Sequence, residues 1–230
     1  MIFDPSKPPL TDSAGLLKSI PVEAGPEIWK RDTRVISSGL CDLQVNGFAG
    51  VDYNDPTLMP EEFEKSLFAM LSTGVTTCLP TVITGSEDWQ IQCFHALEAG
   101  RNASKLAQAM VPGYHLEGPF LNPEEGFCGC HPTKWMRSAT WDHFERLQEA
   151  AGGRITLITV APEIKGVLDL IPKWVEKGIA VAIGHCNPDR DTLLRAADAG
   201  ATLSTHLGNG IAQMLPKTDN PILGQLAEDR

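Results

Sequence analysis

Three titratable residues, Glu117, His185 and His206, each end a short run of residues typical of a buried β-strand. Because the carboxyl ends of parallel strands share one rim of a sheet or barrel, we expect the three side chains to face the same rim. One carboxylate and two imidazoles can hold a divalent cation. Such a set leaves a coordination position open for water, as in catalytic zinc sites.

The same residues have a simpler interpretation, in which each is a separate core or surface group with its own hydrogen bonds. For a single histidine that interpretation is the more common one, but three residues at strand ends favour the metal site. Two local features agree with it. Glu117-Gly118-Pro119 turns the chain sharply after the carboxylate, and Gly184 permits close backbone approach before His185.

The elements that would position these residues repeat along the chain as an amphipathic helix, a glycine, and a β-branched strand. After Pro60, apolar residues with helical spacing lead to Gly74, and later copies lead to Gly178 and Gly200. Further helices are expected over 86–99, 140–151 and 166–177. In the last of these, Pro172 either kinks the helix or marks its start.

Six strands are expected, near 40–45, 76–81, 111–117, 155–161, 179–185 and 202–206. Strands that alternate with helices through short glycine turns pair in parallel through right-handed crossovers. The pattern predicts an α/β fold, either a barrel or a doubly wound sheet. Titratable residues gathered at the strand ends favour the barrel.

Composition excludes several classes of protein. The net charge of −10 argues against a surface that binds nucleic acid or anionic lipid. No apolar run is long enough to span a bilayer, and the first residues lack the apolar core of a signal peptide, so we expect a cytoplasmic protein. The six cysteines are scattered, and reduced thiols are expected.

Five motifs together resemble one enzyme family. They are the segment 39–55, His115-Leu-Glu-Gly-Pro-Phe-Leu-Asn-Pro123, Val160-Ala-Pro-Glu163, Ile183-Gly-His-Cys-Asn187 and Thr205-His-Leu-Gly-Asn-Gly210. Their order and spacing are similar to those of the N-acetylglucosamine-6-phosphate deacetylases of the amidohydrolase superfamily. The resemblance implies a metal-dependent hydrolase on a distorted (β/α)8 barrel, with a small β-sandwich made from both chain ends. Residues 36–230 would then form an incomplete TIM-like barrel with about six of eight strands, and residues 1–35 an irregular remnant of the sandwich.

The resemblance also implies that Glu117, His185 and His206 hold the metal. Many amidohydrolases carry His-x-His on the first strand, which supports a second metal, whereas this chain has Gln44-Val-Asn46. Neutral amides are poor replacements for imidazole as zinc ligands. We therefore expect one divalent ion, with zinc as the first choice and iron, manganese or cobalt as alternatives, and substrate or ligand-supporting contacts from Gln44 and Asn46.

Other substrate contacts follow from the resemblance. His131 corresponds to a loop histidine that contacts the sugar and polarises the acetamide carbonyl. Asn209 and Gly210 match positions that meet the substrate, and Lys217 is the available cation where the family has a phosphate-binding arginine. Cys128-Gly-Cys130 beside His131 could instead form a thiolate metal corner, but a structural zinc would need further ligands.

The implied reaction removes the N-acetyl group of N-acetylglucosamine 6-phosphate and gives glucosamine 6-phosphate and acetate. The family places its proton-shuttling aspartate after a seventh strand, beyond Arg230. We therefore expect the chain to be part of a longer protein, a homodimer when complete, and the 230 residues alone to be inactive. Two alternatives are an amidohydrolase for another N-acyl sugar or a cyclic amide, and a degenerate barrel that only binds.

Several remaining residues have ordinary structural interpretations. Trp89, Trp141 and Trp174 fall on predicted helices and are expected to pack in the core. His95 and His143 are expected at the surface. Glu163 follows the fourth strand and is expected to be a hydrogen-bonded structural carboxylate.

Overall fold

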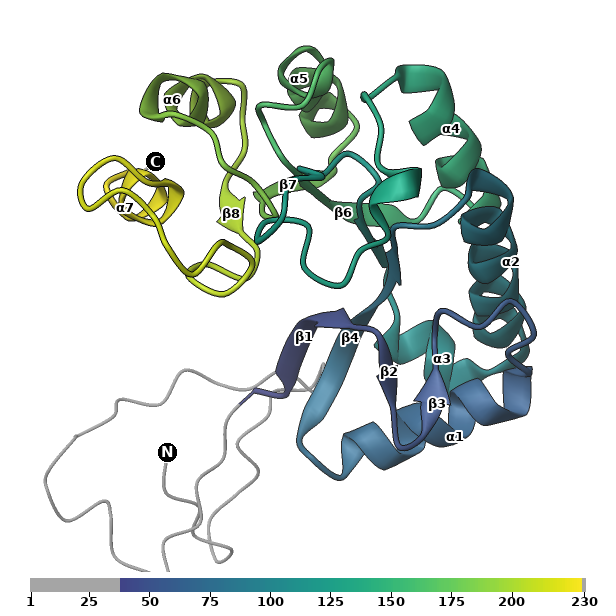
Figure 1. The fold of residues 1–230 in the computed structure, drawn as a ribbon. Helices are drawn as coiled ribbons and strands as arrows, with labels where there is room; N and C mark the ends of the chain where they lie inside the picture. The colour runs from purple at the N-terminus through teal and green to yellow at the C-terminus, as the bar shows by residue number, and fades with distance from the viewer. Residues whose placement is uncertain (1–37, 229–230) are drawn as a thin grey trace, which may run out of the picture. The chain divides into compact units, whose positions relative to one another are not determined.

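The computed structural model describes residues 38–228, so the predicted lead-in over 1–35 lies outside the described residues. A six-stranded sheet and a separate pair of short strands carry the β-structure (Figure 1). The large sheet contains β1 (Leu40–Val45), β4 (Val75–Ile83), β5 (Tyr114–Glu117), β6 (Ile155–Val160), β7 (Ala180–Ile183) and β8 (Leu203–Ser204); the pair contains β2 (Gly47–Phe48) and β3 (Val51–Asp52).

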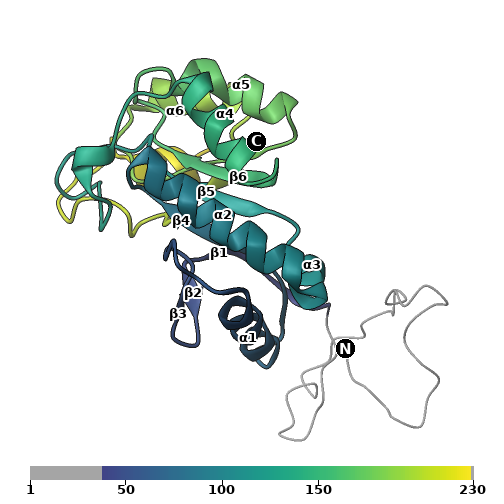
Figure 2. The same ribbon diagram turned by 90° about the vertical axis from the view of Figure 1, so that its right-hand side faces the viewer.

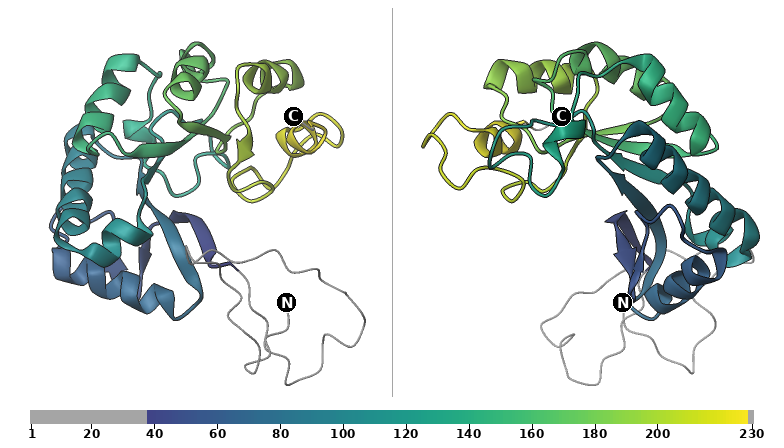
Figure 3. Two further views of the ribbon diagram at one scale, coloured as in Figure 1. Left: turned by 180° about the vertical axis from the view of Figure 1, so that it is seen from behind. Right: turned by 45° about the vertical axis from the view of Figure 1, so that its right-hand side comes forward.

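The strand order of the large sheet is β1-β4-β5-β6-β7-β8, so each strand lies beside the next one of that sheet in the chain. All pairs from β4 to β8 are parallel. A doubly wound sheet would reverse this order at a switch point. The sheet curls with helices on its outer side, as in part of a (β/α)8 barrel, which confirms the predicted fold class (Figures 2 and 3).

In the described part of the chain, all α-helices except Lys105–Met110 and Pro221–Leu226 were predicted from the sequence. The helices are α1 (Pro60–Leu71), α2 (Glu87–Ala103), α3 (Lys105–Met110), α4 (Trp141–Ala150), α5 (Val167–Glu176), α6 (Arg190–Asp198) and α7 (Pro221–Leu226), with a 3-10 turn over Thr133–Trp135. Pro172 lies inside α5, so the alternative that it marks the start of that helix is wrong. Among the described residues, no helix is both long and apolar enough to cross a bilayer.

The strand predicted over 111–117 is shorter than expected and begins at Tyr114. Residues 111–113 form a loop before the strand. The helix ahead of that loop, α3, was not predicted; the Ser104 hydroxyl accepts a hydrogen bond from the Ala107 backbone amide and caps it directly after α2. Within β5, Tyr114 packs against Phe94 of α2, with ring centroids 5.8 Å apart. Alternation along the strand therefore turns His115 and Glu117 toward the inner face of the sheet.

Aromatic side chains fill the layer between helices and sheet. Trp174 is fully buried and stacks on Phe120 at 6.2 Å, while Trp89 and Trp141 pack partly buried against the same core, as predicted. His143 corrects the prediction of a surface residue: it is 4% exposed because the inner face of α4 packs against α2. Its Nδ1 lies 3.0 Å from Glu87 Oε2.

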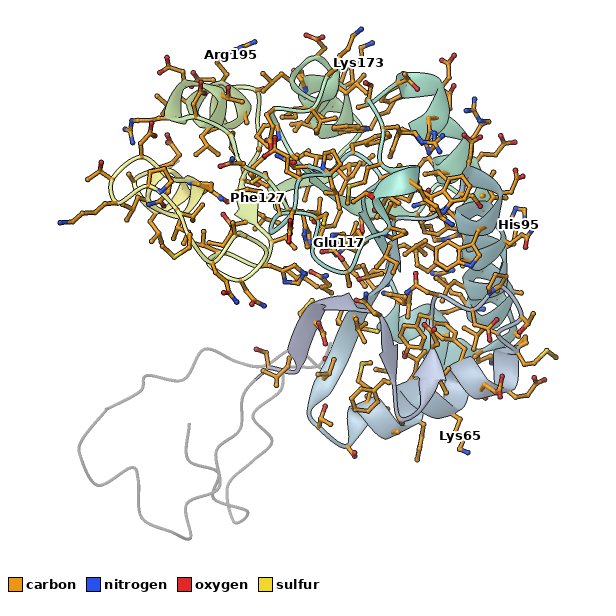
Figure 4. All side chains as sticks on the ribbon, viewed as in Figure 1. Lys65, His95, Glu117, Phe127, Lys173 and Arg195 are labelled. Atoms are coloured by element: carbon orange, nitrogen blue, oxygen red, sulfur yellow. The ribbon has the colours of Figure 1, made fainter. Side chains whose placement is uncertain are left out.

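Two other predictions about side chains are confirmed. His95 is exposed on α2, and Figure 4 shows it pointing away from the sheet. All six cysteines have free thiols.

Candidate metal centre

Glu117, His185 and His206 come together at the carboxyl ends of three strands. Glu117 is the last residue of β5, and the two histidines follow β7 and β8. One ligand atom from each residue lies within 4.8 Å of the others. In the described part of the chain, this is the one such group of three or more His, Cys, Asp or Glu residues, and neither Cys128 nor Cys130 belongs to it. Figure 4 shows Glu117 inside the curve of the sheet.

The distances between these atoms match those between ligands of a single small cation. His206 Nε2 lies 3.0 Å from Glu117 Oε1, and His185 Nε2 lies 3.4 Å from the same oxygen. Ligands about 2.0–2.1 Å from a tetrahedral zinc are themselves about 3.3 Å apart. Glu117 and His185 are buried, at 2% and 5% exposed, whereas the His206 side chain is 35% exposed and opens the site to solvent.

Hydrogen bonds fix which imidazole nitrogens face the centre. His185 Nδ1 donates to the Phe127 carbonyl at 2.8 Å, so its Nε2 lone pair points at Glu117. The Gln44 amide nitrogen lies 3.2 Å from His206 Nε2, the ring nitrogen that also lies 3.0 Å from Glu117 Oε1. Glu117 Oε1 and His185 Nε2 are buried without a hydrogen-bond partner among the described residues. Acceptors that face one another in this way fit a divalent cation between them.

The electrostatics keep the glutamate ionised. Burial acts to raise the pKa of Glu117, but contacts with His131 and His185 outweigh it and hold the pKa well below its usual range. Burial likewise acts to lower the pKa of His185, and the opposing contacts with Glu117 and the Phe127 carbonyl raise it overall. A raised pKa means that His185 holds a second proton more readily when no cation is bound. A metal must displace that proton in order to bind.

Both ligand histidines have a left-handed backbone, with φ of +50° at His185 and +53° at His206. This conformation costs roughly 1–2 kcal/mol in a residue with a Cβ, and histidine is among the side chains that enter it more readily. Gly184 is needed for close packing, as predicted: a Cβ there would lie 2.8 Å from the Thr205 Cβ. The turns after β7 and β8 are thus packed against each other directly before both ligands.

His131 lies beside the three ligands. Its Nε2 is 3.6 Å from Glu117 Oε2, and its ring centroid is 4.5 Å from that of His185. Thr84 holds the other nitrogen, with the backbone amide donating to Nδ1 at 3.4 Å and the hydroxyl 2.9 Å away. Because Nδ1 accepts, the remaining proton is on Nε2 and faces the centre.

The chain is similar in sequence and in structure to N-acetylglucosamine-6-phosphate deacetylases. No family model matches the chain. It is 27% identical to an N-acetylglucosamine-6-phosphate deacetylase of Bacillus subtilis (strain 168), over 94% of this chain and 55% of the relative. The crystal structure of N-acetyl-D-glucosamine-6-phosphate deacetylase from Mycobacterium smegmatis superposes with a TM-score of 0.73 at 27% identity, over 83% of this chain and 48% of that chain.

The relatives of this chain from Bacillus subtilis (strain 168) and Homo sapiens are both named N-acetylglucosamine-6-phosphate deacetylase, as is the protein in the Mycobacterium smegmatis structure. One relative differs in the sugar: an N-acetylgalactosamine-6-phosphate deacetylase of Shewanella sp. (strain ANA-3) is 34% identical over 87% of this chain and 49% of the relative. The chain spans about half the length of the curated deacetylases that it matches.

The residues predicted to contact a deacetylase substrate differ in how near they lie to Glu117, His185 and His206. Gln44 lies against His206, and a Cβ at Gly210 would be 3.2 Å from His206 Cβ, so both positions border the ligands. The Asn209 amide donates to the His206 carbonyl at 2.7 Å, and its side chain is exposed. Asn46 and Lys217 are exposed, and the described contacts do not join either side chain to the three ligands.

One buried polar residue on the inner face of the sheet was not among the predicted site residues. His115 is 1% exposed, and its Nε2 lies 2.7 Å from the Thr159 hydroxyl, which in turn lies 2.8 Å from the Thr205 hydroxyl next to His206. Burial lowers the pKa of His115 to about 4, so the ring is neutral near pH 7. Its position two residues before Glu117 in one strand was the available signal, because such residues share a face.

Proposed function

We propose that the chain carries the metal centre of a hydrolase that removes the N-acetyl group of N-acetylglucosamine 6-phosphate, giving glucosamine 6-phosphate and acetate. One observation carries the proposal: buried acceptor atoms of Glu117 and His185 lack hydrogen-bond partners among the described residues and converge with His206 at ligand spacing. The names of the homologous enzymes supply the substrate class.

Glu117, His185 and His206 would hold one divalent ion, with zinc proposed first because one carboxylate and two imidazoles suit it. When bound, such an ion lowers the pKa of a coordinated water toward about 7 and polarises a carbonyl oxygen. The Phe127 carbonyl would contribute by accepting the Nδ1 proton of His185, so that Nε2 is the nitrogen of the neutral ring that can bind the metal. Iron, manganese and cobalt are the alternatives that metal analysis would distinguish.

His131 would donate its Nε2 proton as a hydrogen bond to the acetamide oxygen while negative charge develops there. Thr84 keeps that donor aimed at the centre by occupying Nδ1. Loss of one such donor in other enzymes lowers the rate about 10²–10³-fold. Gln44, Asn46, Asn209 and Gly210 would contact the sugar, and Lys217 would offer a single positive charge to its phosphate.

The test measures metal binding and acetate release on the purified chain. We expect about one equivalent of zinc and slow acetate release from N-acetylglucosamine 6-phosphate, because the resemblance assigns the proton shuttle to an aspartate after a seventh strand. Rapid turnover would assign the shuttle to a residue of this chain. A metal content unchanged by His185→Asn and His206→Asn would overturn the proposed centre.

A second sugar is favoured by a specific finding, the N-acetylgalactosamine-6-phosphate deacetylase among the relatives. Assays should therefore compare both N-acetylhexosamine 6-phosphates and the unphosphorylated sugars. Equal rates with and without the phosphate would exclude a role for Lys217. The homodimer and the cytoplasmic location stay predictions, which sedimentation and fractionation of the native protein would test.

A further inference from the structure

The carboxylate of Glu163 joins the loop that follows Glu117 to the turn that carries His185, although no hydrogen bond links it to either ligand side chain. Glu163 follows β6, the strand between β5 and β7. Its Oε1 accepts a hydrogen bond from Asn122 Nδ2 at 2.9 Å and another from the Asn187 backbone amide at 2.6 Å. Asn122 lies in the loop after Glu117, and Asn187 lies two residues after His185.

A further bond completes this connection. The backbone amide of Asn122 donates to the backbone carbonyl of His185 at 3.0 Å, so the loop after β5 is bonded to the ligand residue itself. Asn122 is 5% exposed, and Glu163 Oε2 is fully buried without a hydrogen-bond partner among the described residues. A carboxylate taken from water to this extent has a substantial desolvation penalty, which the two bonds to Oε1 reduce only in part.

The bonds surround a strained point of the backbone. His185 has φ of +50°, a conformation that its neighbours must hold in place. Glu163 fixes the amide two residues after His185, and Asn122 fixes the His185 carbonyl. Relaxation of this turn would move His185 Nε2 away from Glu117 Oε1 without removing a ligand.

We propose that Glu163 is a positioning residue of the metal centre, which sets the distance between Glu117 and His185 by tying the loop after β5 to the turn after β7. The inference rests on the proposed metal site. Groups that hold metal ligands in position typically change metal affinity about 10- to 100-fold when they are lost.

The experiment titrates zinc into the full chain against a chromophoric chelator. We expect Glu163→Ala to weaken zinc binding about 10- to 100-fold. Glu163→Gln should lose clearly less, because its amide oxygen can still accept both hydrogen bonds. The matched control is Glu145→Ala, which deletes a carboxylate on the exposed face of α4. This variant should bind zinc like the wild type.

A cobalt spectrum separates positioning from loss of stability. The d–d absorption of bound Co²⁺ reports ligand geometry, so Glu163→Ala should change its intensity or position even at saturating metal, and Glu145→Ala should not. If Glu163→Ala does not fold, Asn122→Ala provides the same test. Where both fold, the double variant should bind zinc no more weakly than the worse single variant, because the two residues act through one connection.

The outcomes distinguish this inference from the proposed site. Absence of zinc binding by the wild type, or full binding by His185→Asn, would refute the metal centre itself. Normal wild-type binding that is lost in His185→Asn but unchanged in Glu163→Ala would refute the positioning role alone. Equal losses in Glu163→Ala and Glu163→Gln would also overturn it, because the accepting oxygen would then not be the relevant feature.

Discussion

At the scale of single residues, the centre depends on atoms that accept hydrogen bonds and find no donor. Glu117 Oε1 and His185 Nε2 are both of this kind, and both are buried. A buried carboxylate is unfavourable unless it is paired, and the neighbouring imidazoles hold the pKa of Glu117 low in spite of its burial. The arrangement is therefore suited to a cation and poorly suited to a neutral core.

Replacing Glu117 by glutamine tests this directly. An amide oxygen is a much weaker ligand than a carboxylate, so we expect Glu117→Gln to lower bound zinc from about one equivalent to a small fraction after gel filtration. Elemental analysis of the eluted protein gives the measurement. Glu145→Gln on the exposed face of α4 is the control, and retention of a full equivalent by Glu117→Gln would contradict the assigned ligand set.

The convergence of Glu117, His185 and His206 and the contact of Gln44 with His206 were predictable from the sequence, whereas the other contacts around them were not. Glu117, His185 and His206 each end a strand-like run, and parallel strands bring such ends together. Thr84, His115 and Asn122 act through contacts between strands distant in sequence, such as the 2.9 Å approach of Thr84 to His131. No local pattern encodes these contacts, because they depend on register and on side-chain direction.

At the scale of elements, the sequence predicted which strands are present better than it predicted their lengths. Residues 111–113 form a loop where strand was expected, and β8 has two residues where 202–206 was expected. The burial of His143 was missed because the inner face of α4 is decided by its contact with α2. Helix spacing shows which positions share a face but not what lies against it.

The contact between α2 and α4 predicts a pH dependence of stability. Glu87 bonds with the Arg146 guanidinium and lies near His143, and the bond with Arg146 lowers the pKa of Glu87 below its ordinary 4.5. The folded state therefore binds this proton less readily than the unfolded chain. The stabilisation is present above pH 4.5 and is lost as the pH falls through the lowered value.

We expect Glu87→Gln to reduce the free energy of unfolding at neutral pH by about 1 kcal/mol or less, because Arg146 is half exposed. The difference from the wild type should shrink as the pH falls from 4.5 through the lowered pKa of Glu87, because the side chain then becomes neutral in both states. Urea unfolding at several pH values provides the measurement. A difference that is the same at acid and neutral pH would assign the effect to packing instead.

At the scale of the whole molecule, the order of the strands connects the ligands. Glu117 belongs to β5, and the two histidines follow β7 and β8, so a bound ion would join a large part of the sheet. A ligand that binds only the folded state stabilises it by an amount set by its concentration relative to its dissociation constant. The proposed centre should thus contribute to stability as well as to chemistry.

Zinc should therefore raise the unfolding temperature. At a free concentration about 100 times the dissociation constant, the gain is about 2.7 kcal/mol. For a chain of this size that corresponds to an increase of about 5–10 °C. Differential scanning calorimetry with zinc and with chelator measures the shift. His206→Asn should abolish it, and a similar shift in that variant would show that zinc binds elsewhere.

The spread of the three ligands along the sheet also bears on how the protein assembles. Each of the strands β5, β7 and β8 positions one ligand only, so no single strand can bind the cation. The last ligand follows β8, an edge strand of the described sheet. In a refolding experiment with a fluorescent zinc indicator, uptake should lag behind the recovery of helical signal. The moment of uptake would then report the docking of β8 against the rest of the sheet.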